Sequence, residues 1–412
     1  MQAENNKNNI KTLSMGCRLN ALESEKIQKM LSGHINTAII VNTCAVTAEA
    51  ERQSGQSIRR IARENPNAPI FVTGCAATRN PVLFGQIPNT FVIHNRDKMN
   101  ISAYITAMQN SPCGITNPMI EKFNNTDTVL SKRFVQVQNG CNHKCAYCVT
   151  RLLRGPGVSF EYNDILSDVR DAVKSGFYEI VLTGVDIASY ARDGMLISDV
   201  CKCLLRDVPE IQRLRLSSMD PASPEIFKII DLMHSDARMM PHMHLSMQSG
   251  SDTVLGAMGR RHNGETVRRI VRAAGENITF SWDIICGFPG ESDQLFAETL
   301  ALVRDTRPIK IHAFPFSPRP GTPAADMPGQ NDRSVSKHRG HEITGIADEN
   351  MSDFMNRCVN ATAQILVEEN NIARDPHDIP VKITGDKIAA KTICDVYISG
   401  IENNMFIGHI VK

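Results

Sequence analysis

The feature that most constrains this chain is a short stretch, residues 138–148, that carries three cysteines. Cys141, Cys145 and Cys148 are separated by three and then two intervening residues, a spacing that lets the three thiols face one inorganic centre. A structural zinc ion would need a fourth protein ligand. His143 lies inside the loop, but no Cys or His follows at the usual spacing of a second ligand pair. Three thiolates on a four-iron cluster leave one iron open to a small molecule. We therefore favour a cluster over zinc or three unrelated cysteines.

Length and composition indicate a multidomain protein of the cytoplasm. A chain of 412 residues is long for one domain, so two or three are expected. No window approaches the ~20 apolar residues of a membrane span, and the polar N-terminus lacks the apolar core of a signal peptide. Because the cytosol keeps thiols reduced, the 12 cysteines should bind metal or be buried. With 45 Lys and Arg against 44 Asp and Glu, any nucleic acid must be met by a local basic patch.

The N-terminal part of the chain alternates short apolar runs with helical patterns. The predicted strands cover residues 11–15, 38–43 and 69–74, and the predicted helices 19–31 and 47–64. This alternation predicts a parallel sheet, whose sites lie beyond the carboxyl ends of the strands. Cys17, Cys44 and Cys75 each follow a predicted strand. We expect them to form a second cluster site with three protein ligands, with three separately buried cysteines as the alternative.

After a linker at residues 111–130, in which Cys113 is unassigned, six apolar strands alternate with helical stretches. The predicted strands are 134–138, 179–183, 214–217, 244–248, 280–286 and 309–316, and the helices 161–175, 196–207, 223–234, 264–275 and 292–305. Repeated units of this kind form a barrel, part of one or an open sheet, with chemistry at the carboxyl ends of the strands. The loop with the three cysteines follows the first strand, where an active-site loop belongs.

The cysteine loop resembles that of the radical S-adenosylmethionine (SAM) enzymes, in which an aromatic residue at the position of Tyr147 packs against the adenine. A three-cysteine segment ahead of such a core resembles the methylthiotransferases. Residues 17–25 and 42–47 are similar to the branch that acts on threonylcarbamoyladenosine in transfer RNA (tRNA). The resemblance implies an α/β fold with three domains. These are an N-terminal parallel α/β sheet domain (1–110), a radical SAM partial (β/α)6 barrel (131–350) and a small TRAM-like β-barrel (359–412).

The resemblance also implies which residues bind SAM: Tyr147, Arg154, Gly184, Asp186, Ser218 and Gln248. Gly184 and Asp186 lie at the corner that receives the amino group of SAM. Ser218 and Gln248, at later strand ends, are able to hydrogen-bond its ribose and carboxylate. Arg154 is expected to meet the carboxylate of SAM or a substrate phosphate. Ordinary turn chemistry, or a solvated arginine, is the alternative for each.

Two basic clusters are candidate contacts for RNA phosphates. The first comprises Arg260, Arg261, His262, Arg268, Arg269 and Arg272, and the second comprises Arg59, Arg60 and Arg63. The C-terminal tail holds five Lys and Arg against seven Asp and Glu in residues 359–412, a difference of −2. That balance is a poor footprint for RNA, so the tail either contacts RNA by shape or is mainly structural.

The implied function is the addition of a methylthio group to C2 of N6-threonylcarbamoyladenosine beside the anticodon. It implies two [4Fe–4S] clusters, with SAM as both radical source and methyl donor. The implied partners are tRNA, an electron donor such as flavodoxin or ferredoxin, and a sulfur source, with no membrane. Related enzymes that act on isopentenyladenosine or a ribosomal protein share the cysteines and remain alternatives. A non-enzymatic cluster carrier or RNA-binding protein would leave the SAM-like strand ends unexplained.

Overall fold

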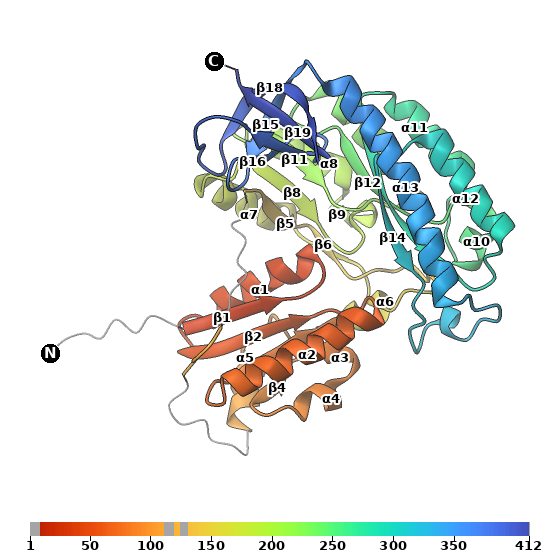
Figure 1. Cartoon of the computed structure of the whole chain (residues 1–412). Coiled ribbons are helices and arrows are strands. Elements are labelled where there is room, and N and C mark those ends of the chain that lie inside the picture. Colours follow the sequence, from red (N-terminus) through yellow and green to blue (C-terminus); the bar gives the residue numbers. More distant parts are fainter. Residues whose placement is uncertain (1–8, 111–118, 124–130, 412) are drawn as a thin grey trace.

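The structure is a computed structural model that describes residues 9–110, 119–123 and 131–411. Figure 1 shows an N-terminal sheet in red and orange, a larger group of strands and helices in yellow to cyan, and a small barrel in dark blue. Among the residues described, none of the helices combines the length and the apolar character that crossing a bilayer requires.

The N-terminal sheet is parallel, with the strand order β1-β2-β3-β4. Its elements are β1 (Asn9–Ser14), α1 (Arg18–Leu31), β2 (Thr37–Thr43), α2 (Ala48–Glu64), β3 (Ile70–Gly74), α3 (Cys75–Arg79), α4 (Pro81–Gly85), β4 (Thr90–Val92) and α5 (Ile101–Gln109). The central strands are buried because α2 covers one face of the sheet and α1 with α5 the other. The predicted parallel sheet is therefore confirmed, and the carboxyl ends of β1, β2 and β3 lie side by side.

Part of the predicted linker packs on this sheet. Ile120 and Phe123 lie against its core, and the Asn65 side chain accepts hydrogen bonds from the backbone of Glu121 and Lys122. Cys113 and the rest of the linker lie outside the described residues.

Six parallel strands form the central part of the molecule as two three-stranded sheets, β5-β8-β11 and β12-β13-β14. The strands are β5 (Arg133–Gln136), β8 (Glu179–Thr183), β11 (Arg213–Leu216), β12 (His242–Gln248), β13 (Thr279–Cys286) and β14 (Lys310–Pro315). Bridges at Leu214–Met239 and Met219–Leu245 join β11 to the chain of β12. The six strands thus make a partial barrel, as expected, with Trp282 fully buried in its core.

Helices surround this partial barrel, and short strands connect them. The helices are α6 (Thr150–Arg154), α7 (Tyr162–Lys174), η1 (Ile187–Ser189), α8 (Ile197–Asp207), α9 (Glu225–Ser235), α10 (Asp252–Ala257), α11 (Gly264–Ala274), α12 (Asp293–Thr306), η2 (Pro323–Ala325) and α13 (Arg333–Cys358). The short strands are β6 (Gln138–Asn139), β7 (Val158–Ser159), β9 (Ala191–Arg192) and β10 (Met195–Leu196). In α11, for example, Val267, Ile270 and Ala274 are buried at helical spacing, which fixes the face it turns to the core.

The C-terminal tail is a closed five-stranded barrel in the order β15-β16-β17-β19-β18. Its strands are β15 (Thr362–Val367), β16 (Ile372–Arg374), β17 (Pro380–Ile383), β18 (Ile393–Glu402) and β19 (Met405–Ile410). Two buried arginines of β11 form hydrogen bonds with the loop between β16 and β17. Arg213 donates to the carbonyl of Asp375 at 2.7 Å, and Arg215 donates to that of Pro376 at 2.8 Å. The tail therefore has a structural role, because its loop closes the amino-terminal end of the partial barrel.

Candidate active site

The first cysteine set lies in the loop after β5 and β6, at the carboxyl end of the partial barrel. The backbone N–H of His143 donates to the Cys141 Sγ at 3.4 Å, and Arg260 donates to the Cys145 Sγ at 3.7 Å. Burial raises the pKa of Cys141 to about 11, and the nearby Asp186, Cys148 and Cys145 add to the shift. Three close, partly buried thiols suit a soft metal centre, whose positive charge would favour their thiolate forms.

Gln138 ties this loop to the corner predicted to receive the amino group of SAM. Its side-chain N–H donates to the carbonyl of Gly140 at 2.7 Å, and its side-chain oxygen accepts from the backbone of Val185 and Asp186 at 3.0 and 2.8 Å. A Cβ on Gly184 would lie 2.7 Å from the Gln138 carbonyl oxygen, so only glycine allows this approach. Gly184 and Asp186 therefore lie beside the cysteine loop, with the Asp186 carboxylate 3.9 Å from the Cys141 Sγ.

A cavity of about 230 Å³ lies between this loop and the N-terminal sheet. Its lining includes Tyr147, Cys148, Gln248, Asp283, Ile285 and Phe314 from the partial barrel and Val46 and Thr47 from the segment before α2. Gln248 has a φ of +72°, rare for a side-chain-bearing residue, where the β12–β13 register shifts. Such local strain is common at binding sites. The structure thus brings the predicted Tyr147 and Gln248 together at one cavity with Asp283 and Ile285 of β13.

A second polar group, at the carboxyl end of the partial barrel, was not predicted from the sequence. Asp220, after β11, accepts from Arg260 at 2.9 Å and from Arg261 at 2.6 Å. The Nε2 of His143 lies 2.9 Å from Asp186 and 3.6 Å from Asp220. Burial opposes ionisation of Asp220, but Arg260 and Arg261 outweigh it and hold its pKa below the usual value. The predicted Ser218 is half-buried two residues before Asp220.

The first basic cluster is open to phosphates only in part, since Arg261, at 55% exposed, and Arg269 remain at the surface. The Arg260 side chain is 7% exposed against Asp220, and His262 is buried. Arg268 pairs with Asp305 at 2.6 Å and Arg272 with Glu265 at 2.5 Å. Most of the positive charge expected to face RNA here is therefore matched by carboxylates of the chain itself.

The second cysteine set lies at the carboxyl edge of the N-terminal sheet. Cys44 and Cys75 directly follow Thr43 and Gly74, which are partners in the β2–β3 register. A Cβ on Gly16, beside Cys17, would lie 2.5 Å from the Cys44 Sγ. Burial raises the pKa of Cys44, and Cys17 and Cys75 add to the shift. The structure therefore gathers the three thiols, and their donor set suits a soft metal centre.

Arg154 connects the N-terminal sheet with the first cysteine loop. Its guanidinium, 3% exposed, donates to Glu23 at 2.8 Å, to Asn20 at 2.6 Å and to Asn139 at 3.1 Å. Burial opposes its charge, but Glu23 and the nearby Cys75 more than compensate and raise its pKa. The structure thus gives Arg154 partners other than the SAM carboxylate or substrate phosphate expected from the sequence. Local sequence patterns could not reveal the main partner, Glu23, because it lies 131 residues away along the chain.

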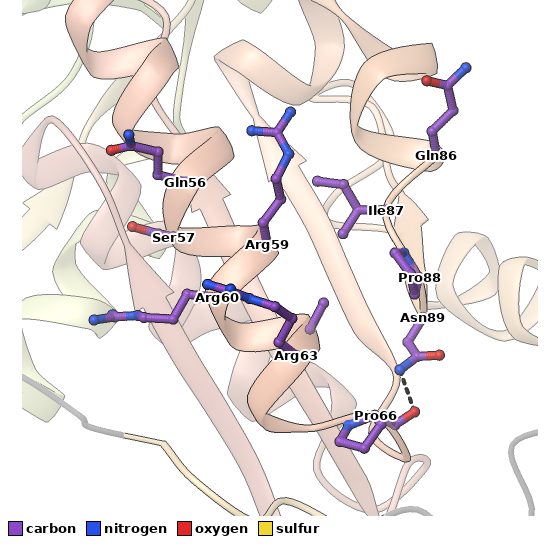
Figure 2. Close-up of a pocket in the computed structure, with 11 residues that line it drawn as sticks. Gln56, Ser57, Arg59, Arg60, Arg63, Pro66, Gln86, Ile87, Pro88 and Asn89 are labelled. Carbon is purple, nitrogen blue, oxygen red and sulfur yellow. Dashed lines mark hydrogen bonds between the residues drawn. The ribbon is translucent and has the colours of Figure 1, made fainter.

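The second basic cluster is exposed and lines a groove of about 1080 Å³. Figure 2 shows Arg59, Arg60 and Arg63 projecting from α2, across from residues 86–89 between α4 and β4. None of the three forms an ion pair with a residue that the structure describes. The groove, which we call the α2 groove, is therefore a positively charged surface open to an anionic partner.

Known proteins resemble the chain over nearly its whole length. Residues 135–303 match the family described as Radical SAM superfamily, and residues 9–93 match Uncharacterized protein family UPF0004. The threonylcarbamoyladenosine tRNA methylthiotransferase MtaB of Rickettsia prowazekii is 36% identical, covering 96% of each chain. The tRNA-2-methylthio-N(6)-dimethylallyladenosine synthase of Sphingopyxis alaskensis is 29% identical, covering 95% of each.

A solved structure shares the fold. The radical SAM methyltransferase TsrM of Kitasatospora setae, with tryptophan and a SAM analog bound, gives a TM-score of 0.55 at 15% identity, covering 75% of this chain and 67% of that one. Together with the two cysteine sets and the cavity beside them, these similarities show that the chain belongs to the radical SAM methylthiotransferase family.

Proposed function

We propose that this enzyme adds a methylthio group to C2 of N6-threonylcarbamoyladenosine beside the anticodon of tRNA. The observation that carries the proposal is the pair of three-cysteine sets, one at the mouth of the partial barrel and one at the edge of the N-terminal sheet, connected through Arg154. The MtaB enzyme of Rickettsia prowazekii, which is 36% identical and is named for threonylcarbamoyladenosine, supports this choice of nucleoside. Because tRNA places this adenosine in a loop, the base can be unstacked and presented to a cavity.

The residues present fit two [4Fe–4S] clusters and SAM. Cys141, Cys145 and Cys148 would hold one cluster. Cys17, Cys44 and Cys75 would hold the other. When bound, these groups supply one-electron cleavage of SAM, sulfur, and the methyl group. An electron donor such as flavodoxin or ferredoxin and a source of replacement sulfur complete the proposal.

The chain itself orients these groups. Gln138 and Gly184 fix the corner at which Asp186 faces the cysteine loop. Tyr147 offers an aromatic face for adenine, and Gln248 offers its amide to the ribose or carboxylate of SAM. Ser218 remains a candidate for the same contact.

The α2 groove is suited to hold the stem of the tRNA. The N-cap of α2, Thr47, lines the cavity, whereas Arg59 and Arg63 lie 12 and 16 residues further along. At a rise of 1.5 Å per residue, these side chains stand about 18–24 Å from the cavity along the helix. A stem whose loop enters the cavity can therefore place backbone phosphates on the groove.

Mass spectrometry of tRNA nucleosides tests the proposal. Cells that lack the protein should lose 2-methylthio-threonylcarbamoyladenosine and regain it on expression of the wild type but not of a Cys44→Ser variant. If the dimethylallyl analogue changes instead, the reaction stands and the nucleoside assignment is wrong. If neither nucleoside responds, the tRNA proposal is wrong.

A further inference from the structure

A second cavity, of about 370 Å³, lies inside the partial barrel, towards the amino-terminal ends of its strands. All six strands contribute to its wall: Phe134, Val181, Arg215, His242, His244, Ser281, Lys310 and His312. Arg374, at the end of β16, and His377 and Asp378, in the loop that follows it, also line the cavity. We call it the lower cavity, and the one beside Tyr147 and Cys148 the upper cavity.

The two cavities share a wall. Asp283 lines the upper cavity, and its carboxylate lies 3.1 Å from the Nε2 of His244, which lines the lower one. Phe314 and His312 likewise belong to the upper and lower cavity and are two residues apart on β14. Two residues along a strand span about 6.6 Å, so a group a few bonds long can reach the level of His312. Lys310, two residues further along β14, lines the same cavity.

Polar side chains, rather than apolar ones, occupy the boundary. The Oγ of Ser281 lies 2.9 Å from the Nε2 of His242 and 2.8 Å from the Nδ1 of His244, and Asp283 extends this chain upward. The His312 ring packs against His244 with centroids 5.6 Å apart. An apolar substituent entering here would desolvate these groups without replacing their contacts with water.

The charge of the lower cavity is unbalanced in favour of cations. Arg215, Lys132 and Arg374 are matched by Glu179, Asp378 and Glu368. Lys310 and Arg18, both exposed to the cavity, form no ion pair with the residues that the structure describes, and Arg18 lies over the Phe134 ring at 5.4 Å. One exposed carboxylate, Asp348, also lines the wall. Within the lower cavity two cations stand against this one anion, which favours a carboxylate ligand there, while Asp283 lies at the boundary and contacts His244.

We propose that the lower cavity recognises the carboxylate of the N6 substituent of the substrate nucleoside, with Lys310 as the main counter-charge and His312 and Arg18 beside it. The inference rests on the proposed function, in which the target adenine is presented at the upper cavity, beside the SAM that Tyr147 and Gln248 would contact. A threonylcarbamoyl group carries a carboxylate and a hydroxyl, whereas an isopentenyl group carries neither. The lower cavity therefore selects between the two nucleosides by charge, because only the threonylcarbamoyl group offers an anion to Lys310.

Two anticodon stem-loops that differ in one group test this proposal. One carries threonylcarbamoyladenosine and the other its threoninamide analogue, in which a neutral amide replaces the carboxylate. Affinity is measured by fluorescence anisotropy, and methylthio product by mass spectrometry with the reconstituted full-length enzyme. One charge-assisted contact should make the wild type prefer the carboxylate about tenfold to a hundredfold.

The variant Lys310→Met should bring this preference close to one by weakening only the carboxylate substrate, and Lys310→Arg should keep most of it. Lys174→Met, at an exposed position at the end of α7, is the matched control and should keep it fully. Equal handling of both stem-loops by the wild type would overturn the inference, as would an equal loss on both in Lys310→Met. A binding preference without any methylthio product would support carboxylate recognition and contradict the proposed reaction.

Discussion

The ion pair of Arg154 with Glu23 offers a quantitative test of how the two cysteine sets are held together. The two side chains are 3% and 1% exposed, and the guanidinium also satisfies Asn20 and Asn139. Removing one partner of a buried pair costs about 3–5 kcal/mol. Lys98 stays 2.6 Å from Glu23 and continues to neutralise it, so we expect the lower end, about 3 kcal/mol, for Arg154→Met.

The melting temperature of the metal-free protein measures this cost. For a folded unit of 150–250 residues, about 1 kcal/mol shifts the midpoint by about 2–4 °C, so Arg154→Met should lower the first transition by about 6–12 °C. Arg133→Met is the matched control, because Arg133 pairs with Glu25 across the same junction but the side chains are 33% and 45% exposed. Exposed pairs contribute about 1 kcal/mol at most. If the two variants melted alike, the buried junction described here would be refuted.

Three further predictions concern the loop, the groove and acid stability. Gly184→Ala should push residues 184–186 away from Gln138 and reduce SAM cleavage by at least about tenfold. Gly256→Ala, where a Cβ meets nothing within 4 Å, should leave SAM cleavage unchanged in the same assay. Replacing Arg59, Arg60 and Arg63 with glutamate should weaken tRNA binding and make the slope of log affinity against log salt concentration shallower by about two to three, while SAM cleavage without tRNA stays normal. An unchanged slope would exclude the α2 groove as a tRNA contact. Burial opposes the charge of Glu23, but Lys98 and Arg154 still hold its pKa below the usual 4.5. Its stabilising contribution is therefore complete above pH 4.5 and is lost as the pH falls through the lower folded value, so Glu23→Gln should melt with a smaller acid dependence than the wild type between pH 6 and pH 3.

The sequence predicted those features that depend on local spacing. The strand-helix alternation located β1, β2 and β3, and hence the shared edge of Cys17, Cys44 and Cys75, because parallel strands align their carboxyl ends. The strand β4 was missed because it is only three residues long, too short for a pattern to register.

Features that depend on pairing between distant segments were beyond local reasoning. Arg260 lies in a run of cations, which indicates a solvated or RNA-facing surface, yet its partner Asp220 stands 40 residues earlier and turns it inward. Arg154 is similar, since Glu23 is 131 residues away. Gln138 looked like an ordinary strand residue. Only the fold shows that its amide bridges two loops of the site.

The iron content of reconstituted protein tests the central claim, that the chain holds two separate clusters with separate tasks. The wild type should bind about eight iron atoms per chain, and a variant with Cys17, Cys44 and Cys75 all changed to serine about four. That variant should still cleave SAM to 5′-deoxyadenosine and make no methylthiolated tRNA. Full iron loading or methylthiolated product from the triple variant would contradict the account.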